Sequence, residues 1–208
     1  MSPRSPYDGV VLAAPHSTAY QRYSTDTAHV WLARALKGTL DAAGLRKDQI
    51  DGLSVASFTL FPDSAVGLTQ HLGLGLRYLD SIPMGGASGI VGLRRAARAV
   101  QAGDASIVAC IAGDTNQIDS FRKLLSSFSR FAMDASYPYG YGGPNSMFAL
   151  LTDAYMDTYG ATREDFGRLC VAQRDNALRN PNALMKKPLT MDDYLAARPI
   201  SDPIALFD

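Results

Sequence analysis

Met84-Gly-Gly-Ala-Ser-Gly89 is a tight turn of small residues, and its flanks indicate the architecture of the N-terminal part of the chain. The preceding residues, Arg77 to Pro83, are typical of a strand, and the following residues repeat apolar positions at helical spacing up to Gly103. Ser106-Ile-Val-Ala-Cys-Ile-Ala112 is a short apolar run typical of a buried strand. This succession predicts a layered α/β domain. The expected inner face of the helix consists of Ile90, Leu93, Ala97 and Val100.

The same alternation of strands and helices extends toward the N-terminus. Gly9 to Ala14, which is followed by Pro15, has the composition of a buried strand. Residues 26–43 carry an apolar stripe at helical spacing, and Gly44 suits the end of that helix. Gly52 to Phe58 alternates like a strand, and a helix is expected from Pro62 through His71. The stripe consists of Ala28, Leu32, Leu36 and Leu40, with Ala35 and Ala43 beside it.

The character of the chain changes after about Thr115. Ser120 to Phe131 is amphipathic but weakly patterned, and Ser136 to Pro144 is a loop rich in Gly, Pro and Tyr. We expect no strand from 115 to 200. The sequence predicts an α/β half over residues 1–115 and a mainly helical domain over residues 116–208. The expected helices run from Ser146 to Tyr159, from Thr162 (a capping box with Asp165) to about Leu178, and briefly after Thr190.

The composition excludes several classes of protein. The 208 residues hold 20 Lys+Arg and 20 Asp+Glu, so the chain lacks the basic excess of nucleic-acid-binding proteins. Hydrophobic residues make up 47%, which is enough for a core and too many for a disordered chain. No apolar run has the length of a membrane span, and Met1 to Gly9 lacks the features of a signal peptide. We expect a cytoplasmic protein that binds no nucleic acid and does not cross a membrane.

No motif for a metal or a bound cofactor is found. The 3 histidines lack the spacing of metal ligands, so we expect no metal site. The glycines of the turn lack the G-x-G-x-x-G spacing of a dinucleotide site. Cys110 and Cys170 are interpreted as small buried hydrophobic residues, because neither begins a helix, where a thiolate would be stabilised.

The turn over residues 84–89 is the best remaining candidate for a site. A group at the start of a helix gains from the helix dipole and from backbone N–H groups that lack an intrahelical acceptor. Ser88 is the one side chain of the turn with nucleophilic capacity, and its alternative role is that of an ordinary first-turn residue. The small residues allow either close approach of a ligand to the backbone or tight packing.

Several motifs in order along the chain resemble the thiolase superfamily. Ala42-Ala-Gly-Leu45 with Asp48-Gln-Ile-Asp-Gly52, and Ala102-Gly-Asp-Ala-Ser-Ile-Val108, are similar to thiolase segments. From residue 146 onward the series resembles the sterol-carrier-protein-x branch, also called lipid-transfer-protein thiolases. The resemblance covers essentially the whole chain and implies a thiolase-like layered αβα core half with an inserted, mainly helical loop domain. Its later motifs are Met147-Phe-Ala149, Tyr155 to Gly160, Arg163 to Phe166, Asn180-Pro-Asn182 and Asp202 to Leu206.

Two departures from the thiolase pattern limit the activity that the resemblance implies. The thiolase nucleophile is a Cys in a C-A-S/T-G turn, and Gly86 of Gly86-Ala-Ser-Gly89 occupies the matching position. Glycine cannot form an acyl-enzyme. A complete thiolase is also roughly twice as long, with two related halves, so its catalytic His residues and second Cys would lie beyond Asp208. We therefore expect association with a complementary thiolase half, with a second copy, or with both, because an isolated half would expose apolar surface.

The resemblance implies a protein that acts on acyl-CoA without a covalent nucleophile. Relatives of this kind are retro-aldolases on acyl-CoA thioesters, including steroid side-chain intermediates, and assemble with a small zinc-ribbon/OB-fold partner. We expect a carbon–carbon lyase on a β-hydroxyacyl-CoA, with coenzyme A as part of the substrate and no bound cofactor. The alternatives are a non-catalytic binding or assembly subunit and an acyltransferase with a displaced nucleophile.

The resemblance also implies that the loop domain binds CoA. Arg174, Lys186 and Lys187 are candidates because cations suit phosphate groups, and ordinary surface charge is the alternative. Tyrosines of the Gly/Pro-rich loop are candidates to line an acyl tunnel or else to pack the loop. At the turn, Gly85 and Gly86 are candidate substrate contacts, with the backbone N–H groups of residues 86–88 as donors. The loop tyrosines are Tyr137, Tyr139 and Tyr141.

Overall fold

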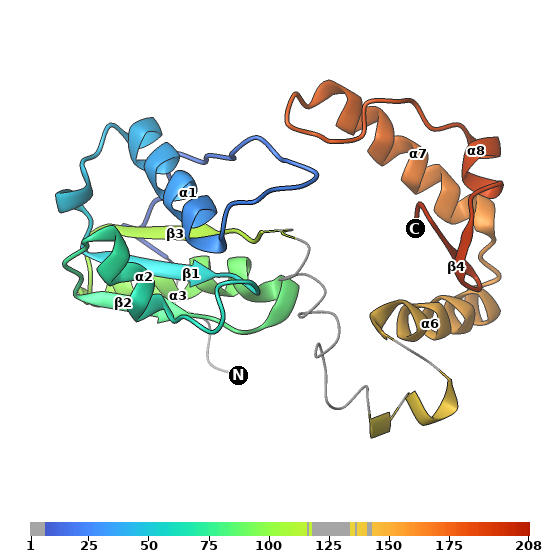
Figure 1. Ribbon diagram of the computed structural model, residues 1–208, viewed down its shortest axis with the longest axis horizontal. Helices are drawn as coiled ribbons and strands as arrows, with labels where there is room; N and C mark the ends of the chain where they lie inside the picture. The colour runs from blue at the N-terminus through green and yellow to red at the C-terminus, as the bar shows by residue number, and fades with distance from the viewer. Residues whose placement is uncertain (1–6, 116, 118–133, 136, 141–142) are drawn as a thin grey trace. The chain divides into compact units, whose positions relative to one another are not determined.

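The computed structural model describes residues 7–115, 117, 134–135, 137–140 and 143–208 (Figure 1). The chain divides into two compact units, which we call the sheet unit (Met1–Leu124) and the helical unit (Leu125–Asp208). Each unit is described by itself. The segment expected to be amphipathic, Ser120 to Phe131, lies outside the described residues.

The centre of the sheet unit is a three-stranded parallel sheet with the strand order β2-β1-β3. β1 (Gly52–Ala56) lies between β2 (Tyr78–Ser81) and β3 (Val108–Ala112). The three strands confirm the expected ones, although β1 ends two residues earlier, β3 begins two residues later, and β2 is shorter at both ends. Before β3, the N–H groups of Ser106 and Ile107 donate to the Asp51 carboxylate at 2.8 Å.

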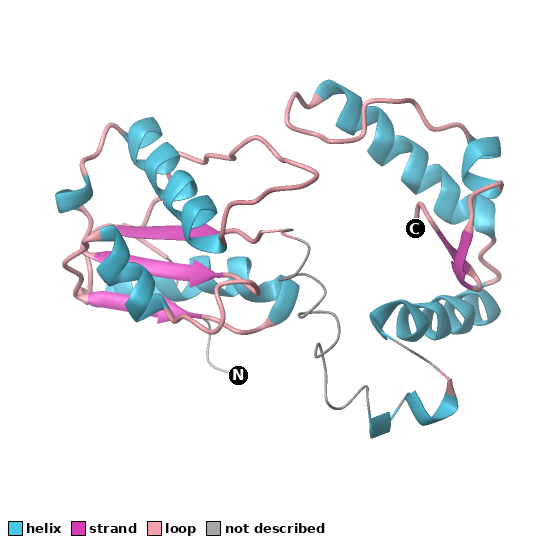
Figure 2. Ribbon diagram, in the orientation of Figure 1, coloured by secondary structure: helices cyan, strands magenta, loops and turns pink. Residues whose placement is uncertain are grey.

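Helices cover both faces of this sheet (Figure 2). α1 (Ala28–Ala43) and α2 (Ala65–Leu72) pack on one face, and α3 (Ser88–Ala102) packs on the other. Because strand side chains alternate between faces, Leu53 contributes to the core beneath α1 and α2, whereas Ser54 points toward α3. The layered α/β fold predicted from the sequence is thus confirmed.

The apolar stripe of α1 is the inner face that its spacing predicts. All four stripe residues are buried, and Leu32 is fully inaccessible to solvent. The helix ends at Gly44, which adopts the left-handed conformation (φ 65°) that favours glycine at a helix end. A 3-10 turn (Lys47–Gln49) then leads into β1.

The expected inner face of α3 is wrong. The buried positions are Ser88, Gly92, Ala96 and Ala99, whereas Ile90 is 73% exposed. Small residues face the sheet because the helix lies very close to it: a Cβ atom on Gly92 would lie 2.8 Å from Ser54 Oγ. The larger Leu93 and Val100 are partly buried and line a cavity at the open edge of the sheet.

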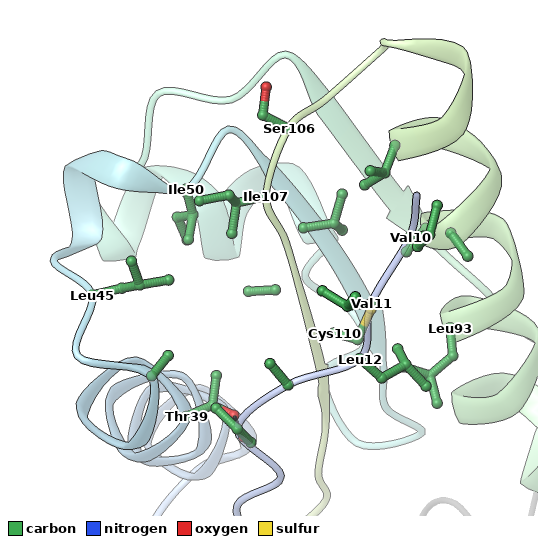
Figure 3. Close-up of a pocket in the computed structure, with 18 of the residues that line it drawn as sticks. Val10, Val11, Leu12, Thr39, Leu45, Ile50, Leu93, Ser106, Ile107 and Cys110 are labelled. Carbon is green, nitrogen blue, oxygen red and sulfur yellow. Dashed lines mark hydrogen bonds between the residues drawn. The ribbon is translucent and has the colours of Figure 1, made fainter. Parts of the chain in front are cut away.

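The expected strand from Gly9 to Ala14 is also wrong. Val11 and Leu12 are exposed, and a cavity of about 340 Å³ is lined by this stretch, α1, α3 and β3 (Figure 3). Ala14 has a left-handed backbone (φ 52°), and its carbonyl accepts from Thr39 Oγ1 at 2.9 Å. Within the described residues, no strand pairs with the outer edge of β3. The apolar composition is that of a strand, but the pairing that would bury it is absent from the residues that the structure describes.

The described residues of the helical unit include the α-helices expected from the sequence and a short hairpin. The expected helices are confirmed as α6 (Gly143–Tyr159), α7 (Arg163–Arg179) and α8 (Met191–Leu195). The predicted capping box at Thr162 is present, because the Asp165 carboxylate accepts from the N–H of Thr162 at 2.7 Å. The expectation of no strand before residue 200 is wrong, because an antiparallel hairpin begins with β4 (Pro199–Ser201) and ends with β5 (Ile204–Ala205). Strands this short carry too few residues for a period-two pattern.

A buried tyrosine organises the end of the helical unit. The Tyr194 side chain on α8 is fully inaccessible, and its hydroxyl donates to the Asp208 carboxylate. The same carboxylate accepts from Arg163 Nη1 at 2.6 Å and from the N–H of Ala205 at 2.7 Å. Arg163 also stacks on the Tyr194 ring, with its guanidinium carbon 4.7 Å from the centroid. This cluster joins α7, α8 and the hairpin.

Candidate functional site

The predicted turn lies at the edge of the sheet where β1 and β3 end. A 3-10 turn (Gly85–Ala87) leads directly into α3, and Gly86 lines a cavity of about 270 Å³. The last residues of two strands, Ala56 and Ala112, line the same cavity. The carboxyl edge of a parallel sheet is where open α/β sheets place their sites, because the helix N-termini converge there.

Gly85 and Gly86 differ in what their backbone demands. Gly85 has a left-handed backbone (φ 61°), which an L side chain adopts only at a cost. Gly86 does not, and a Cβ atom added there would meet nothing within 4 Å. The turn therefore needs glycine at position 85, whereas position 86 has both the backbone and the space for a side chain.

The hydroxyl of Ser88 closes the turn. It donates to the Gly85 carbonyl at 2.7 Å and accepts from the N–H of Met84 at 3.0 Å. Its proton is therefore engaged within the turn, and the geometry matches the alternative role of an ordinary first-turn residue.

The expected set of backbone donors at residues 86–88 needs a correction. The N–H of Ala87 donates to Met84 O at 3.3 Å, and the N–H of Ser88 donates to Gly85 O. Among the described residues, none accepts from the N–H of Gly86. Two of the three expected N–H donors are therefore already bonded within the 3-10 turn, because each donates to the carbonyl three residues earlier.

Apolar side chains lie in and beside the turn. Ile90 lines the cavity, and Met84 and Ile90 are both more than half exposed. A Cβ atom on Gly85 would lie 3.9 Å from Phe58 Cζ, so the Phe58 ring lies beside the turn. The surface next to the glycines thus suits an apolar group more than a charged one.

The two cysteines have thiols that resist ionisation. Burial raises the pKa of Cys110 to about 11. Burial also raises the pKa of Cys170, with a smaller contribution from the Asp208 carboxylate, and Cys170 Sγ donates to Phe207 O at 3.3 Å. Both groups are neutral at physiological pH, and a neutral thiol is a poor nucleophile.

The three cations that the resemblance assigns to CoA lie together in the helical unit. Arg174 Nη1 donates to the Lys187 carbonyl at 3.0 Å, which joins α7 to the segment before α8. Lys186 Nζ donates to the carbonyls of Asn180 and Pro181 at 3.0 Å. Arg174 and Lys186 thus also stabilise the turn that follows α7.

Of the three tyrosines predicted to line an acyl tunnel, two lie within the described residues. Tyr137–Tyr139 forms a 3-10 turn, and Tyr139 is exposed. Tyr141 lies outside the described residues. Their role in substrate binding stays a prediction.

Sequence analysis missed Phe58 and Asp114. Both follow strands of the sheet, and they are hydrogen-bonded to each other through the Phe58 N–H and Asp114 Oδ1 at 2.7 Å. The position of Asp114 in the sequence could have indicated its place. A polar residue two places after a buried strand lies at the carboxyl edge of a parallel sheet.

Neither a metal cluster nor a membrane-spanning helix is found in the described part of the chain. Across residues 7–115, 117, 134–135, 137–140 and 143–208, no group of three or more His, Cys, Asp and Glu side chains is arranged so that it could hold a metal ion. Over the same ranges, none of the helices combines the length and hydropathy that a membrane span requires.

Comparisons with known proteins support a thiolase-like relationship. It is 30% identical over 207 residues to the steroid side-chain-cleaving aldolase of Thermomonospora curvata. This alignment covers 95% of this chain and 52% of that protein. It is 31% identical over 199 residues to the 17-hydroxy-3-oxo-4-pregnene-20-carboxyl-CoA lyase of Mycobacterium tuberculosis, over 89% of this chain and 51% of that protein. An acetyl-CoA acetyltransferase of Methanocaldococcus jannaschii is 26% identical over 173 residues, which make up 80% of this chain and 43% of that protein. No protein-family model matches the chain.

A solved structure gives the same relationship. The Ltp2-ChsH2(DUF35) aldolase aligns with a TM-score of 0.72 and 28% identity, over 89% of this chain and 48% of that one. The chain therefore has a thiolase-like α/β fold and is related to both aldolases and thiolases. It spans about half the length of the curated relatives it matches.

Proposed function

We propose that this chain belongs to an acyl-CoA lyase that cleaves a β-hydroxyacyl-CoA by a retro-aldol reaction, with a steroid or other lipid side chain as the acyl group. The observation that carries the proposal concerns position 86, in the turn before α3. This position has room for a side chain and a backbone that permits one, yet it holds glycine. The two relatives at 30% and 31% identity, an aldolase and a CoA lyase, support it.

A retro-aldol reaction needs no covalent nucleophile. A base takes the proton of the β-hydroxyl group, the bond between the α- and β-carbons breaks, and its electron pair passes to the thioester as an enolate. The β-carbon leaves as the carbonyl carbon of a ketone or aldehyde. The enolate then takes up a proton at the α-carbon to give a shorter acyl-CoA.

The turn contributes polarity and space to this reaction. The N–H of Gly86, in the turn that leads into α3, is a donor of the kind that stabilises a developing enolate oxygen. Without a side chain at position 86, the cavity that Gly86 and Ile90 line has room for a branched acyl group, and the Phe58 ring adds apolar surface beside the turn. Gly86 supplies no proton-transferring group, so we expect the base from another residue or from a companion protein.

Coenzyme A is the proposed ligand of the helical unit, through Arg174, Lys186 and Lys187. We also propose a companion protein, since the Ltp2-ChsH2(DUF35) aldolase combines two components. Replacing Lys186 and Lys187 together with Ala should raise the Kd for CoA by about tenfold, because two cations near phosphates are lost. Lys37→Ala, which removes a cation paired with Asp41 in the sheet unit, is the matched control and should leave the Kd unchanged.

The direct test uses the full-length protein with any companion that copurifies. Incubation with β-hydroxyacyl-CoA esters, followed by mass spectrometry, should detect equal amounts of a shorter acyl-CoA and a ketone or aldehyde. Binding of these esters without cleavage would instead support a non-catalytic binding or assembly subunit.

A second test addresses position 86. In Gly86→Cys, an acyl-CoA should transfer its acyl group to the new thiol, which the helix N-terminus activates, and release CoA. Intact mass should show acylation of Gly86→Cys, and none of the wild type or of Ala87→Cys, the matched control in the same turn. Acylation of a Ser or Cys in the wild-type protein would support the acyltransferase alternative instead.

A further inference from the structure

Asp114 follows β3 and binds the loop that follows β1. Its Oδ1 atom accepts from the N–H groups of Phe58 at 2.7 Å and Thr59 at 2.9 Å. The same oxygen accepts from the hydroxyls of Ser57 at 3.0 Å and Thr59 at 2.9 Å. These donors belong to three consecutive residues, so one carboxylate oxygen determines the path of the loop.

The hydrogen bonds continue on both sides of this oxygen. Thr59 Oγ1 accepts from the N–H of Thr115 at 2.9 Å, and the buried Thr115 hydroxyl donates to Asp26 O at 2.7 Å. Ser57 Oγ accepts from the N–H of Leu60 at 3.2 Å. The segment before α1 and the loops after β1 and β3 are therefore joined in one network.

The network holds Phe58 against the candidate site. Its ring lies beside Gly85, whose left-handed backbone shapes the turn before α3. A phenylalanine on an unattached loop would move away from the turn and leave the Gly85 side of the turn without an apolar neighbour. The hydrogen bond from the Phe58 N–H to Asp114 prevents this movement.

We propose that Asp114 is a positioning residue of the candidate site, which fixes the Phe58 ring as an apolar wall beside the Gly85–Gly86 turn. The inference rests on the proposed function for its catalytic consequence, although the positioning itself does not depend on it. Asp114 acts through Phe58, and the surface it creates selects bulky apolar acyl groups over short ones.

The test begins with hydrogen exchange of the full-length protein, which is independent of any activity. Asp114→Ala should speed amide exchange on the order of tenfold in peptides covering residues 57–60 and 84–88. Asp51→Ala is the matched control, because Asp51 also binds backbone N–H groups, those of Ser106 and Ile107, at the opposite edge of the sheet. It should speed exchange at residues 106–107 and leave residues 84–88 unchanged. Unchanged exchange at 57–60 and 84–88 in Asp114→Ala would overturn the proposal.

A second variant keeps the test decisive if Asp114→Ala fails to fold. Phe58→Ala retains the backbone hydrogen bonds to Asp114 and removes the ring alone. It should speed exchange at residues 84–88 while residues 57–60 stay protected. Equal protection of residues 84–88 in Phe58→Ala and the wild type would also overturn the proposal.

The kinetic test separates positioning from chemistry. In a cleavage assay, Asp114→Ala and Phe58→Ala should both raise KM for a bulky acyl-CoA by about tenfold, with a smaller change in kcat. Asp114→Asn keeps an acceptor oxygen and should restore most of the loss. An Asn variant that is inactive but has wild-type exchange would overturn positioning and indicate a role in proton transfer. Absence of cleavage in the wild type would count against the proposed function, whereas the exchange result would still decide this inference.

Discussion

The sheet unit and the helical unit are stabilised in different ways. The main hydrophobic cluster lies entirely in the sheet unit and consists of aliphatic side chains from α1, α2, β1, β3 and the loops that join them. In the helical unit, the largest fully buried side chain is Tyr194, whose hydroxyl needs a partner and binds the Asp208 carboxylate. One unit therefore relies on apolar burial, and the other relies on a polar cluster around an aromatic ring.

This difference has consequences for how each unit responds to change. Aliphatic packing loses free energy in proportion to the volume removed and is insensitive to pH. A charged cluster with little exposure is sensitive to the loss of any one member, because the remaining partners stay buried without hydrogen bonds. The four predictions below test this contrast.

The largest effect is expected for Leu53→Ala in the sheet unit. Leu53 is fully inaccessible in β1, so its removal should lower the free energy of unfolding by about 3 kcal/mol. Trp31, the sole tryptophan, lies in α1, so its fluorescence during denaturation reports on this unit. The matched control is Leu12→Ala, because Leu12 is 76% exposed and should change stability by less than about 0.5 kcal/mol. Similar losses in both variants would contradict the core described here.

A somewhat smaller effect is expected for Asp208→Ala in the helical unit. The variant leaves the Tyr194 hydroxyl and Arg163 without their acceptor, so the unit should lose roughly 2–3 kcal/mol. Hydrogen exchange of α7 and α8 measures this loss, while Trp31 fluorescence should be unaffected. Unchanged protection of α7 would show that the cluster contributes little.

The pH dependence of the helical unit should depend on the same residue. Burial alone would raise the pKa of Asp208, but hydrogen bonds from Tyr194, Ala205 and Arg163 outweigh it and hold the pKa below its usual range. Since a lowered pKa stabilises the fold above the unfolded value near 3.9, stability should fall as the pH drops below about 4. Asp208→Asn should weaken this dependence, as measured by exchange of α7 from pH 5 to pH 3. An Asn variant with the full wild-type dependence would assign the effect to other carboxylates, such as Asp165 and Asp193.

The smallest effect separates two neighbouring glycines of the sheet unit. Gly85→Ala should cost about 1 kcal/mol because of the left-handed backbone, whereas Gly86→Ala should be neutral or stabilise by roughly 0.5 kcal/mol. Thermal denaturation of the two variants side by side measures the difference. Equal destabilisation would mean that position 86 also requires glycine for structural reasons, and would weaken the proposed function.

Local patterns predicted most of the secondary structure. The stripe of α1, the capping box at Thr162 and the three strands of the sheet all depend on residues close in sequence, and all are confirmed. The stretch from Gly9 to Ala14 was misassigned because a strand also needs a neighbour to pair with, and composition does not provide one. The inner face of α3 was misassigned for a related reason: size alone favours Leu93 over Gly92, but close contact with Ser54 favours the smaller residue.

The candidate site was predicted in part. Its place at the turn before α3 followed from the small residues and from the resemblance to thiolases. The engaged hydroxyl of Ser88 and the network of Asp114 could not be predicted, because their partners lie on other loops or depend on the exact turn. Asp114 and Phe58 are separated by 56 positions and meet only because β1 and β3 are adjacent.

The sequence by itself determined the layered α/β class, the positions of the helices and the glycine at position 86, since these depend on composition and short-range spacing. The tertiary structure decided which side chains meet at the carboxyl edge of the sheet, and which of the two glycines the backbone requires. The physical reason is distance. Propensity and capping act within one or two helical turns, whereas hydrogen bonds between loops and the space around a glycine exist only after separate strands have paired.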